Sequence, residues 1–175
     1  MIIHNETMDT ILTRCSVRRY QSRQISADEL ETILAAGSHA PSGMNQRPAR
    51  VVVIQSQAGQ KALLKLAKTV TGKTESPFYG APTVLLMFAK KSALTPVEDA
   101  SLAMENMMLA AHSLGLGACW IFAAKAMFHH PEGVRWKQTM GISEEEDIIG
   151  SLAVGYPEGE RPMPKPGTLD FYRMA

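Results

Sequence analysis

The stretch DASLAMENMMLAAHSLG, Asp99–Gly115, carries apolar side chains almost all the way round a helical wheel. The preceding TPVE, Thr95–Glu98, combines the S/T-x-x-E form of a capping box with proline at the first helical position. A helix without a clear polar face is usually buried on all sides. In a chain of 175 residues, this pattern predicts that a second subunit covers one side of the helix.

Shorter patterns on both sides of this helix predict a mixture of helices and strands. Ser26–Glu29 form a second capping box, followed by apolar residues at helical spacing and by Gly37, which suits the position after a helix. The irregular alternation of elements, with no βαβ repeat and no GxGxxG, favours an α+β fold over a Rossmann fold. The other predicted elements are helices at 60–69 and 132–140, strands at 50–55, 81–90 and 147–157, a strand or tight loop at 118–123, and an extended tail at 158–175.

Length and composition predict one globular domain, residues 1–175, with 45% hydrophobic and 20% charged residues. The net charge of +1 argues against a general nucleic-acid role, because phosphate binding is driven by excess lysine and arginine. Cys15 and Cys119 fit no CxxC or zinc pattern, and the start of the chain has no signal-peptide pattern, so we expect reduced thiols in a cytoplasmic protein. The apolar segments are too short to cross a bilayer.

The segment RCSVRRY, Arg14–Tyr20, concentrates three arginines and a serine in a nearly neutral chain. It has two interpretations. It is the solvated end of a first helix, where arginines satisfy terminal carbonyls, or it is an extended clamp on a phosphate monoester. In an extended chain Arg14, Ser16 and Arg18 alternate and face one side, whereas Arg19 points away.

Two further segments each have a structural and a functional interpretation. HAPSGMNQRPARVVVI, residues 39–54, is either a turn between helix and strand or a loop whose small residues let a flat ring approach, with Asn45 as donor and acceptor. In LGLGACWIFA, residues 114–123, the glycines can end a helix, and Trp120 and Phe122 can belong to the core. Cys119 is expected to be a small buried side chain, because no His or Lys stands beside it to lower its pKa.

The sequence predicts no catalytic side chain and no metal site. GxSxG, HExxH and P-loop motifs are missing from the sequence. His129 and His130 are adjacent, so their side chains diverge, and we expect them on the surface without a carboxylate partner.

In their order and spacing, segments from nearly the whole chain resemble the nitroreductase family of FMN-dependent flavoproteins. They are TRCSVRRY, LETILAAGSHAPSGMNQRP, VVVI, YGAPTVLLMFA, DASLAMENMMLAAHSLGLGACWI, IIGSLAVGYP and PKP. The resemblance implies an α+β nitroreductase-like fold with a mixed, mainly antiparallel sheet flanked by helices. It also implies a homodimer with two FMN sites at the subunit interface, each flavin touched by both chains.

The resemblance also implies which residues contact FMN. The phosphate and ribityl clamp would comprise Arg14, Cys15 through its backbone, Ser16 and Arg18. A loop from the other subunit would contribute Pro41, Ser42 and Asn45, and the segment beside flavin N5 would be Trp120, Ile121, Phe122 and Ala123. Lys165 in PKP would reach the phosphate from the C-terminal side.

This sequence departs from the family pattern at several positions. Gly167 stands where a second basic residue is common, Arg47 and Ala49 replace the Gln and Trp of an N-x-Q-P-W loop, and Phe122 replaces an acidic residue. The chain is short, with no lid insertion, so we expect an open pocket and a broad choice of acceptor.

The activity implied by the resemblance is ping-pong transfer of a hydride from NADH or NADPH through FMN to a nitroaromatic, a quinone or a similar small electron acceptor. The cofactor then carries the chemistry, and the protein supplies binding, orientation and electrostatics. Dehalogenation or oxidation of a specific substrate usually needs a lid insertion. Two further alternatives remain, a flavin-binding sensor or carrier without turnover and a dimeric ligand-binding domain without flavin.

Overall fold

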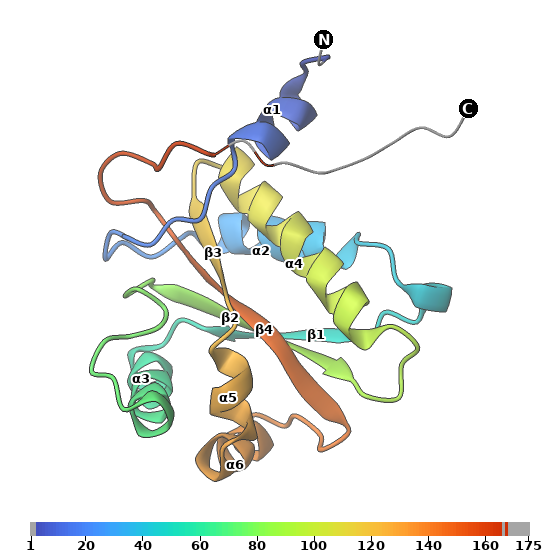
Figure 1. Cartoon of the computed structure of the whole chain (residues 1–175), viewed down its shortest axis with the longest axis vertical. Helices are drawn as coiled ribbons and strands as arrows, with labels where there is room; N and C mark the ends of the chain where they lie inside the picture. The colour runs from blue at the N-terminus through green and yellow to red at the C-terminus, as the bar shows by residue number, and fades with distance from the viewer. Residues whose placement is uncertain (1–2, 166, 168–175) are drawn as a thin grey trace.

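The computed structural model describes residues 3–165 and residue 167. Its centre is a four-stranded antiparallel sheet in the order β1-β2-β4-β3 (Figure 1). The strands are β1 (Ala49–Ile54), β2 (Thr83–Lys90), β3 (Gly117–Ile121) and β4 (Glu146–Gly155). Outside these strands, Ser16 forms a parallel bridge with Ala118. The predicted α+β class with a mainly antiparallel sheet is therefore confirmed.

Both faces of the sheet are covered, and the alternation of side chains along β2 explains why. Val84, Leu86 and Phe88 enter one hydrophobic core, while Leu85, Met87 and Ala89 enter the other. One face carries α2 (Ala27–Ser38) and α4 (Pro96–Ser113), and the other carries α3 (Gln57–Thr71), α5 (Ala124–His129) and α6 (Pro131–Thr139). A short helix, α1 (Glu6–Thr13), lies outside these layers and contacts α4.

Helix α4 is buried on only one side within the chain. Its inner face packs against the sheet and α2 through Ala100, Ala103, Met104, Met107 and Ala111. Val97 and Leu102 on the outer side are each 46% exposed. The burial on all sides that the sequence predicts is therefore not reached by one chain alone.

The two predicted capping boxes have different outcomes. Ser26 and Glu29 form the reciprocal pair, because Ser26 Oγ accepts from Glu29 N at 3.2 Å and Glu29 accepts from Ser26 N at 2.7 Å. The capping box predicted for Thr95 is wrong. Its hydroxyl donates to Asp99 Oδ1 at 2.9 Å and caps no backbone N–H of the helix, although Pro96 does occupy the first helical turn as predicted.

The chain after β4 is extended at residues 156–158 and then bends at residues 159 and 160, so the predicted extended tail is interrupted. Gln21 N donates to Tyr156 O at 2.9 Å and Glu158 N donates to Arg19 O at 3.0 Å, so residues 156–158 run beside residues 19–21. The remainder of the predicted tail, residue 166 and residues 168–175, lies outside the described residues. No described helix is both long and apolar enough to span a membrane.

Candidate functional site

The basic segment 14–20 is extended rather than the last turn of a helix. Helix α1 ends at Thr13, and Arg14 already has ψ 133°. Val17 N then donates to Ala118 O at 3.0 Å, so the segment lies against β3. Gly117 makes this approach possible, because a Cβ there would lie 2.7–2.8 Å from the side chain of Val17. The segment is therefore an extended strand-like stretch and not the end of a helix.

Tyr20 anchors the end of the segment. Its buried hydroxyl donates toward Val17 O, 2.6 Å away, and Ala153 O, 3.1 Å away. Burial raises the pKa of Tyr20, which keeps the phenol protonated and able to donate. The segment is thus held by backbone and side-chain hydrogen bonds, and its arginines are left free for other contacts.

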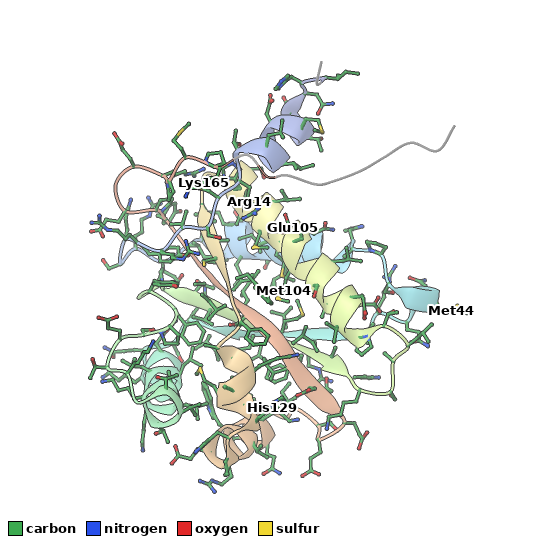
Figure 2. All side chains as sticks on the ribbon, in the orientation of Figure 1. Arg14, Met44, Met104, Glu105, His129 and Lys165 are labelled. Carbon is green, nitrogen blue, oxygen red and sulfur yellow. The ribbon has the colours of Figure 1, made fainter. Side chains whose placement is uncertain are left out.

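The arginines do not all face one hollow. Ser16, Arg18 and Arg19 line a hollow of about 340 Å³ together with Pro157 and Glu158. Arg19 is exposed, as predicted, but it also lies beside this hollow, with its guanidinium 3.6 Å from the Glu158 carboxylate. Arg14 instead reaches α4, where its Nε lies 3.4 Å from Glu105 Oε1. Figure 2 shows Arg14, Glu105 and Lys165 in one part of the view, near the C-terminal end of α4.

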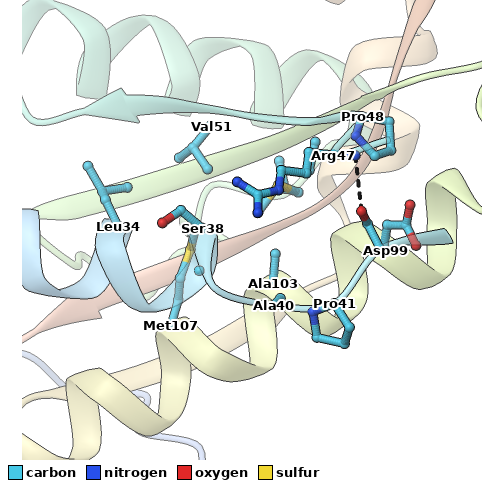
Figure 3. Close-up of a pocket in the computed structure, with 14 residues that line it drawn as sticks. Leu34, Ser38, Ala40, Pro41, Arg47, Pro48, Val51, Asp99, Ala103 and Met107 are labelled. Atoms are coloured by element: carbon cyan, nitrogen blue, oxygen red, sulfur yellow. Dashed lines mark hydrogen bonds between the residues drawn. The ribbon is translucent and has the colours of Figure 1, made fainter. Parts of the chain in front are cut away.

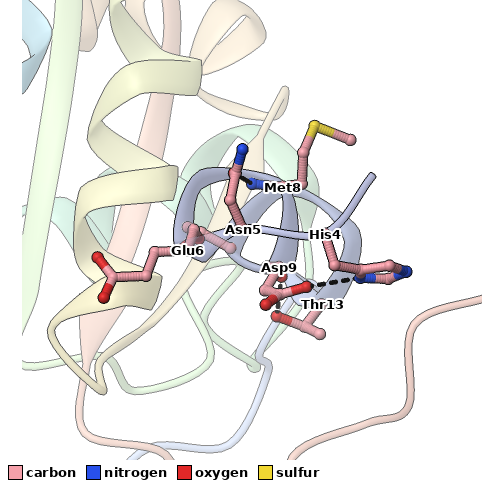
Figure 4. Close-up of polar contacts among 7 residues, drawn as sticks. His4, Asn5, Glu6, Met8, Asp9 and Thr13 are labelled. Atoms are coloured by element: carbon pink, nitrogen blue, oxygen red, sulfur yellow. Dashed lines mark hydrogen bonds and ion pairs between the residues drawn. The ribbon is translucent and has the colours of Figure 1, made fainter. Parts of the chain in front are cut away.

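His112 near the end of α4 connects two distant parts of the chain. Arg161 Nη1 lies 3.1 Å from His112 Nδ1, and Thr13 Oγ1 lies 2.8 Å from His112 Nε2. The Thr13 hydroxyl donates to Asp9 O at 2.6 Å, inside the network of α1 that Figure 4 shows. Arginine only donates, so Nδ1 accepts and Nε2 carries the proton of a neutral ring. Burial and the charges of Arg161 and Arg14 lower the pKa of His112, which favours that neutral form.

Trp120 and Phe122 are exposed, so the interpretation that they belong to the core is wrong. Their side chains are 44% and 60% exposed, and their ring centroids lie 5.9 Å apart. With Ile121 and Ala123 they line an open pocket of about 540 Å³, whose other wall includes Tyr79 and Lys73. Cys119 is buried, as predicted. Tyr79 also lies under Arg18, whose guanidinium carbon is 5.9 Å from the ring centroid, so this pocket adjoins the basic segment.

The loop after α2 adopts a strained backbone. Met44, Asn45 and Arg47 have positive φ angles of 53°, 55° and 48°, which for side chains other than glycine or asparagine cost free energy. Gly43 N donates to Asp99 Oδ1 at 3.0 Å, and Arg47 N donates to Ser42 Oγ at 3.0 Å. Such strain is common at functional sites, and Met44 in this loop is 82% exposed.

A cavity of about 300 Å³ lies beneath this loop (Figure 3). The Arg47 side chain extends over it, with its Nε donating to Asn45 Oδ1 at 3.1 Å. The small side chain of Ala49 leaves room for the cavity. The apolar part of the wall is formed by Leu34, Ala40, Pro41, Pro48, Ala49, Val51, Met87, Ala103 and Met107.

The structure does not bring the loop with Pro41, Ser42 and Asn45 together with the basic segment within one chain. The loop contacts α4 at Asp99, whereas Arg14 of the basic segment contacts it at Glu105 and the preceding Thr13 contacts it at His112. From Asp99 to His112 an α-helix rises by about 20 Å. In Figure 1 the two segments lie near opposite ends of α4.

Several residues near the basic segment could not be found from any local pattern in the sequence. Glu105, His112 and Arg161 are separated from Arg14 by long stretches of chain, and no motif connects them. The expectation that His129 has no carboxylate partner is wrong, since its Nε2 lies 2.8 Å from Asp147 Oδ1. The described residues contain no group of three or more His, Cys, Asp and Glu side chains that could hold a metal ion.

Comparisons with known proteins point to one family. The family model described as "Nitroreductase family" matches residues 11–156. A protein of Archaeoglobus fulgidus, whose name gives NADH dehydrogenase/NAD(P)H nitroreductase as a provisional activity, is 32% identical over 173 residues, which cover 95% of this chain and 90% of that protein. An iodotyrosine deiodinase of Thermotoga neapolitana is 25% identical over 178 residues, covering 88% of this chain and 90% of that protein.

A solved structure agrees with the sequence comparisons. The crystal structure of a nitroreductase with bound FMN from Bacteroides fragilis superposes with a TM-score of 0.88 at 30% identity, covering 97% of this chain and 100% of that chain. The sheet and the helices on its two faces are therefore those of proteins with this fold.

Proposed function

Because the chain belongs to the nitroreductase family, we propose that it is an FMN-dependent oxidoreductase. In this proposal it transfers a hydride from NADH or NADPH through FMN to a nitroaromatic, a quinone or a similar small acceptor. The observation that carries the proposal is the extended basic segment beside an open pocket with exposed aromatic side chains. Relatives named as NAD(P)H nitroreductase or as a nitroreductase with bound FMN support it.

The residues present suit FMN chemically. A phosphate monoester is bound well by guanidinium groups, which can donate two parallel hydrogen bonds, and by hydroxyl donors. Arg14, Ser16, Arg18 and Lys165 would supply them, and the backbone at Cys15 would add to the clamp. The chain has a net charge of only +1, so a local cluster of arginines suits a small dianion such as a phosphate monoester better than a long polyanion.

We propose that two copies of the chain complete each site. The loop bearing Pro41, Ser42 and Asn45 meets α4 at Asp99, near the start of the helix. Arg14 meets α4 at Glu105, about 9 Å further along, and the preceding Thr13 meets it at His112, about 20 Å along. A flavin held by the basic segment of one chain would therefore meet the loop of the other. Val97 and Leu102, exposed on the outer side of α4, would be covered in such a homodimer.

Each group of residues then has a defined task. Bound FMN would supply the redox chemistry, which is hydride acceptance from the nicotinamide and reduction of the second substrate. Trp120, Ile121, Phe122 and Ala123 would form the wall beside the reacting edge, through backbone groups and two exposed rings. Phe122 makes that wall apolar and would favour aromatic acceptors. No side chain is required as an acid or a base.

The first test is the visible absorption spectrum of the purified protein, followed by chromatography of what heat releases. Flavin bands and free FMN are expected, with NADH or NADPH oxidation when a quinone is added. A yellow protein without turnover would support the sensor or carrier alternative. A colourless protein that ignores added FMN would contradict the proposal and leave the ligand-binding alternative.

A variant tests the assignment of the clamp. Arg14→Ala is expected to lose most of its FMN during purification while it keeps its melting temperature within a few degrees, since Arg14 is partly exposed and outside both cores. Arg135→Ala, a change at an exposed arginine on α6, is the matched control and should stay yellow. An Arg14→Ala protein that purifies fully yellow would refute the clamp.

A further inference from the structure

Positive charges converge at the C-terminal end of α4 from two directions. Arg14 directly follows α1, and Arg161 lies in the chain after β4. The His112 imidazole links the two parts of the chain, because Arg161 binds its Nδ1 and Thr13, the residue before Arg14, binds its Nε2.

Arg161 is held without a carboxylate partner among the described residues. Its Nη1 donates to His112 Nδ1 at 3.1 Å, and its Nη2 donates to the backbone oxygen of Gly115. Within the described part of the chain, the ion pairs found include none for Arg161. A guanidinium has five N–H donors, so three remain available. The hydrogen bonds to His112 and Gly115 fix where those remaining donors lie.

Positive charges outnumber negative ones at this place, where Arg14, Arg161 and Lys165 stand against Glu105 and Glu160. Glu105, itself partly exposed, lies 3.4 Å from Arg14 and can offset one positive charge. Lys165 follows Arg161 by four residues, a chain length that spans at most about 14 Å. Like charges gathered in this way repel one another unless an anion binds between them. A dianionic phosphate would balance the cations that Glu105 leaves unpaired.

We propose that Arg161 is a phosphate-binding residue of the FMN site and that His112 is the residue that positions it. This inference rests on the proposed function. Arg161 would replace the second basic group of the family pattern, because Gly167 has no side chain to offer. His112 would hold Arg161 through Nδ1 and, through Thr13, would keep the start of the basic segment beside it.

The experiment compares the affinity for FMN with that for riboflavin, which has the same ring and no phosphate. In the apoprotein, Arg161→Gln is expected to weaken FMN binding about ten- to hundredfold, the effect of losing a hydrogen bond to a charged group. Riboflavin binding should change by less than about twofold. Arg135→Gln is the matched control and should change neither.

Two variants of His112 test its positioning role. The amide of His112→Gln can accept from Arg161 and donate to Thr13, so it should retain most of the preference for FMN over riboflavin. His112→Leu can do neither and should lose about as much of that preference as Arg161→Gln. A purely structural role would lower the melting temperature and weaken both ligands equally.

The outcomes separate this inference from the function on which it rests. A wild-type protein that prefers FMN, combined with an Arg161→Gln variant that shows the same preference, would overturn the role of Arg161 and leave the flavin site intact. Equal weakening of FMN and riboflavin would overturn it as well. Failure of the wild-type protein to bind either flavin would overturn the proposed function and this inference together. If Arg161→Gln does not fold, Arg161→Lys replaces it, with a smaller loss expected for FMN and none for riboflavin.

Discussion

The Nε atom of Arg14 lies 3.4 Å from Oε1 of Glu105, so an acidic side chain of α4 competes for the arginine that we assign to the phosphate. A partly exposed ion pair of this kind contributes about 0.2–1 kcal/mol. Glu105→Gln is therefore expected to tighten FMN binding by up to about fivefold, since the arginine no longer has to leave a carboxylate. Fluorescence titration of the apoprotein with FMN measures this change.

Riboflavin provides the control for this prediction. It carries no phosphate, so its affinity should be the same in Glu105→Gln and in the wild-type protein. Weaker FMN binding by the variant would indicate that Glu105 holds Arg14 in its binding position, contrary to our interpretation.

Because β3 lies so close to the basic segment, a substitution at Gly117 should affect both stability and flavin binding. In Gly117→Ala the new Cβ would lie 2.7–2.8 Å from Cβ and both Cγ atoms of Val17. A β-branched side chain cannot easily turn away, so the segment must shift, at a cost of about 1–3 kcal/mol. We expect a lower urea midpoint together with weaker FMN retention. Gly72→Ala is a control with open space around its Cβ, although its φ of 68° adds backbone strain, and it should affect stability alone.

His112 predicts a specific dependence of stability on pH. Burial, Arg161 and Arg14 lower its pKa below the ordinary 6.5, so the unfolded chain takes up a proton at a higher pH than the folded protein does. The contribution of His112 to the free energy of unfolding is thus complete above pH 6.5 and is lost as pH falls through the lower folded-state pKa. Protonation of Nδ1 would also break the hydrogen bond from Arg161.

Urea unfolding of the wild-type protein and His112→Gln, repeated from pH 7.5 downward, measures this effect. The difference between the two free energies should be constant above pH 6.5 and should shrink below it, because glutamine does not titrate. A difference that grows as the pH falls would contradict the sign of the shift.

Local patterns in the sequence predicted most of the fold. The apolar run of β2 alternates between two cores, and the capping box at Ser26 begins α2 as expected. The Thr95 capping box is not formed, because the Thr95 hydroxyl turns to donate a hydrogen bond to the carboxylate of Asp99 and accepts from no backbone N–H of the helix. That competition depends on side-chain geometry in the first turn, which the S/T-x-x-E pattern does not contain.

The site was predictable only where its residues adjoin in sequence. The segment around Arg14, Ser16 and Arg18 could be found as a basic cluster, and its extended backbone was one of two expectations. The contact between His112 and Arg161 joins residues 49 positions apart, and the contact between Thr13 and His112 joins residues 99 positions apart. Such pairs depend on the packing of α1 and the tail against α4, so no local periodicity predicts them.

The cavity beside Ala49 yields a last prediction, on stability. It measures about 300 Å³ and is bordered by the apolar side chains of Leu34, Val51 and Met107. In Ala49→Leu the added carbon atoms should enter this space, and cavity filling commonly adds about 0.5–2 kcal/mol to the free energy of unfolding. Ala93→Leu, on a turn between β2 and α4, is a control of equal chemistry outside the cavity. If Ala49→Leu has a lower urea midpoint than the wild-type protein and Ala93→Leu does not, the strained loop over the cavity cannot accept a larger side chain.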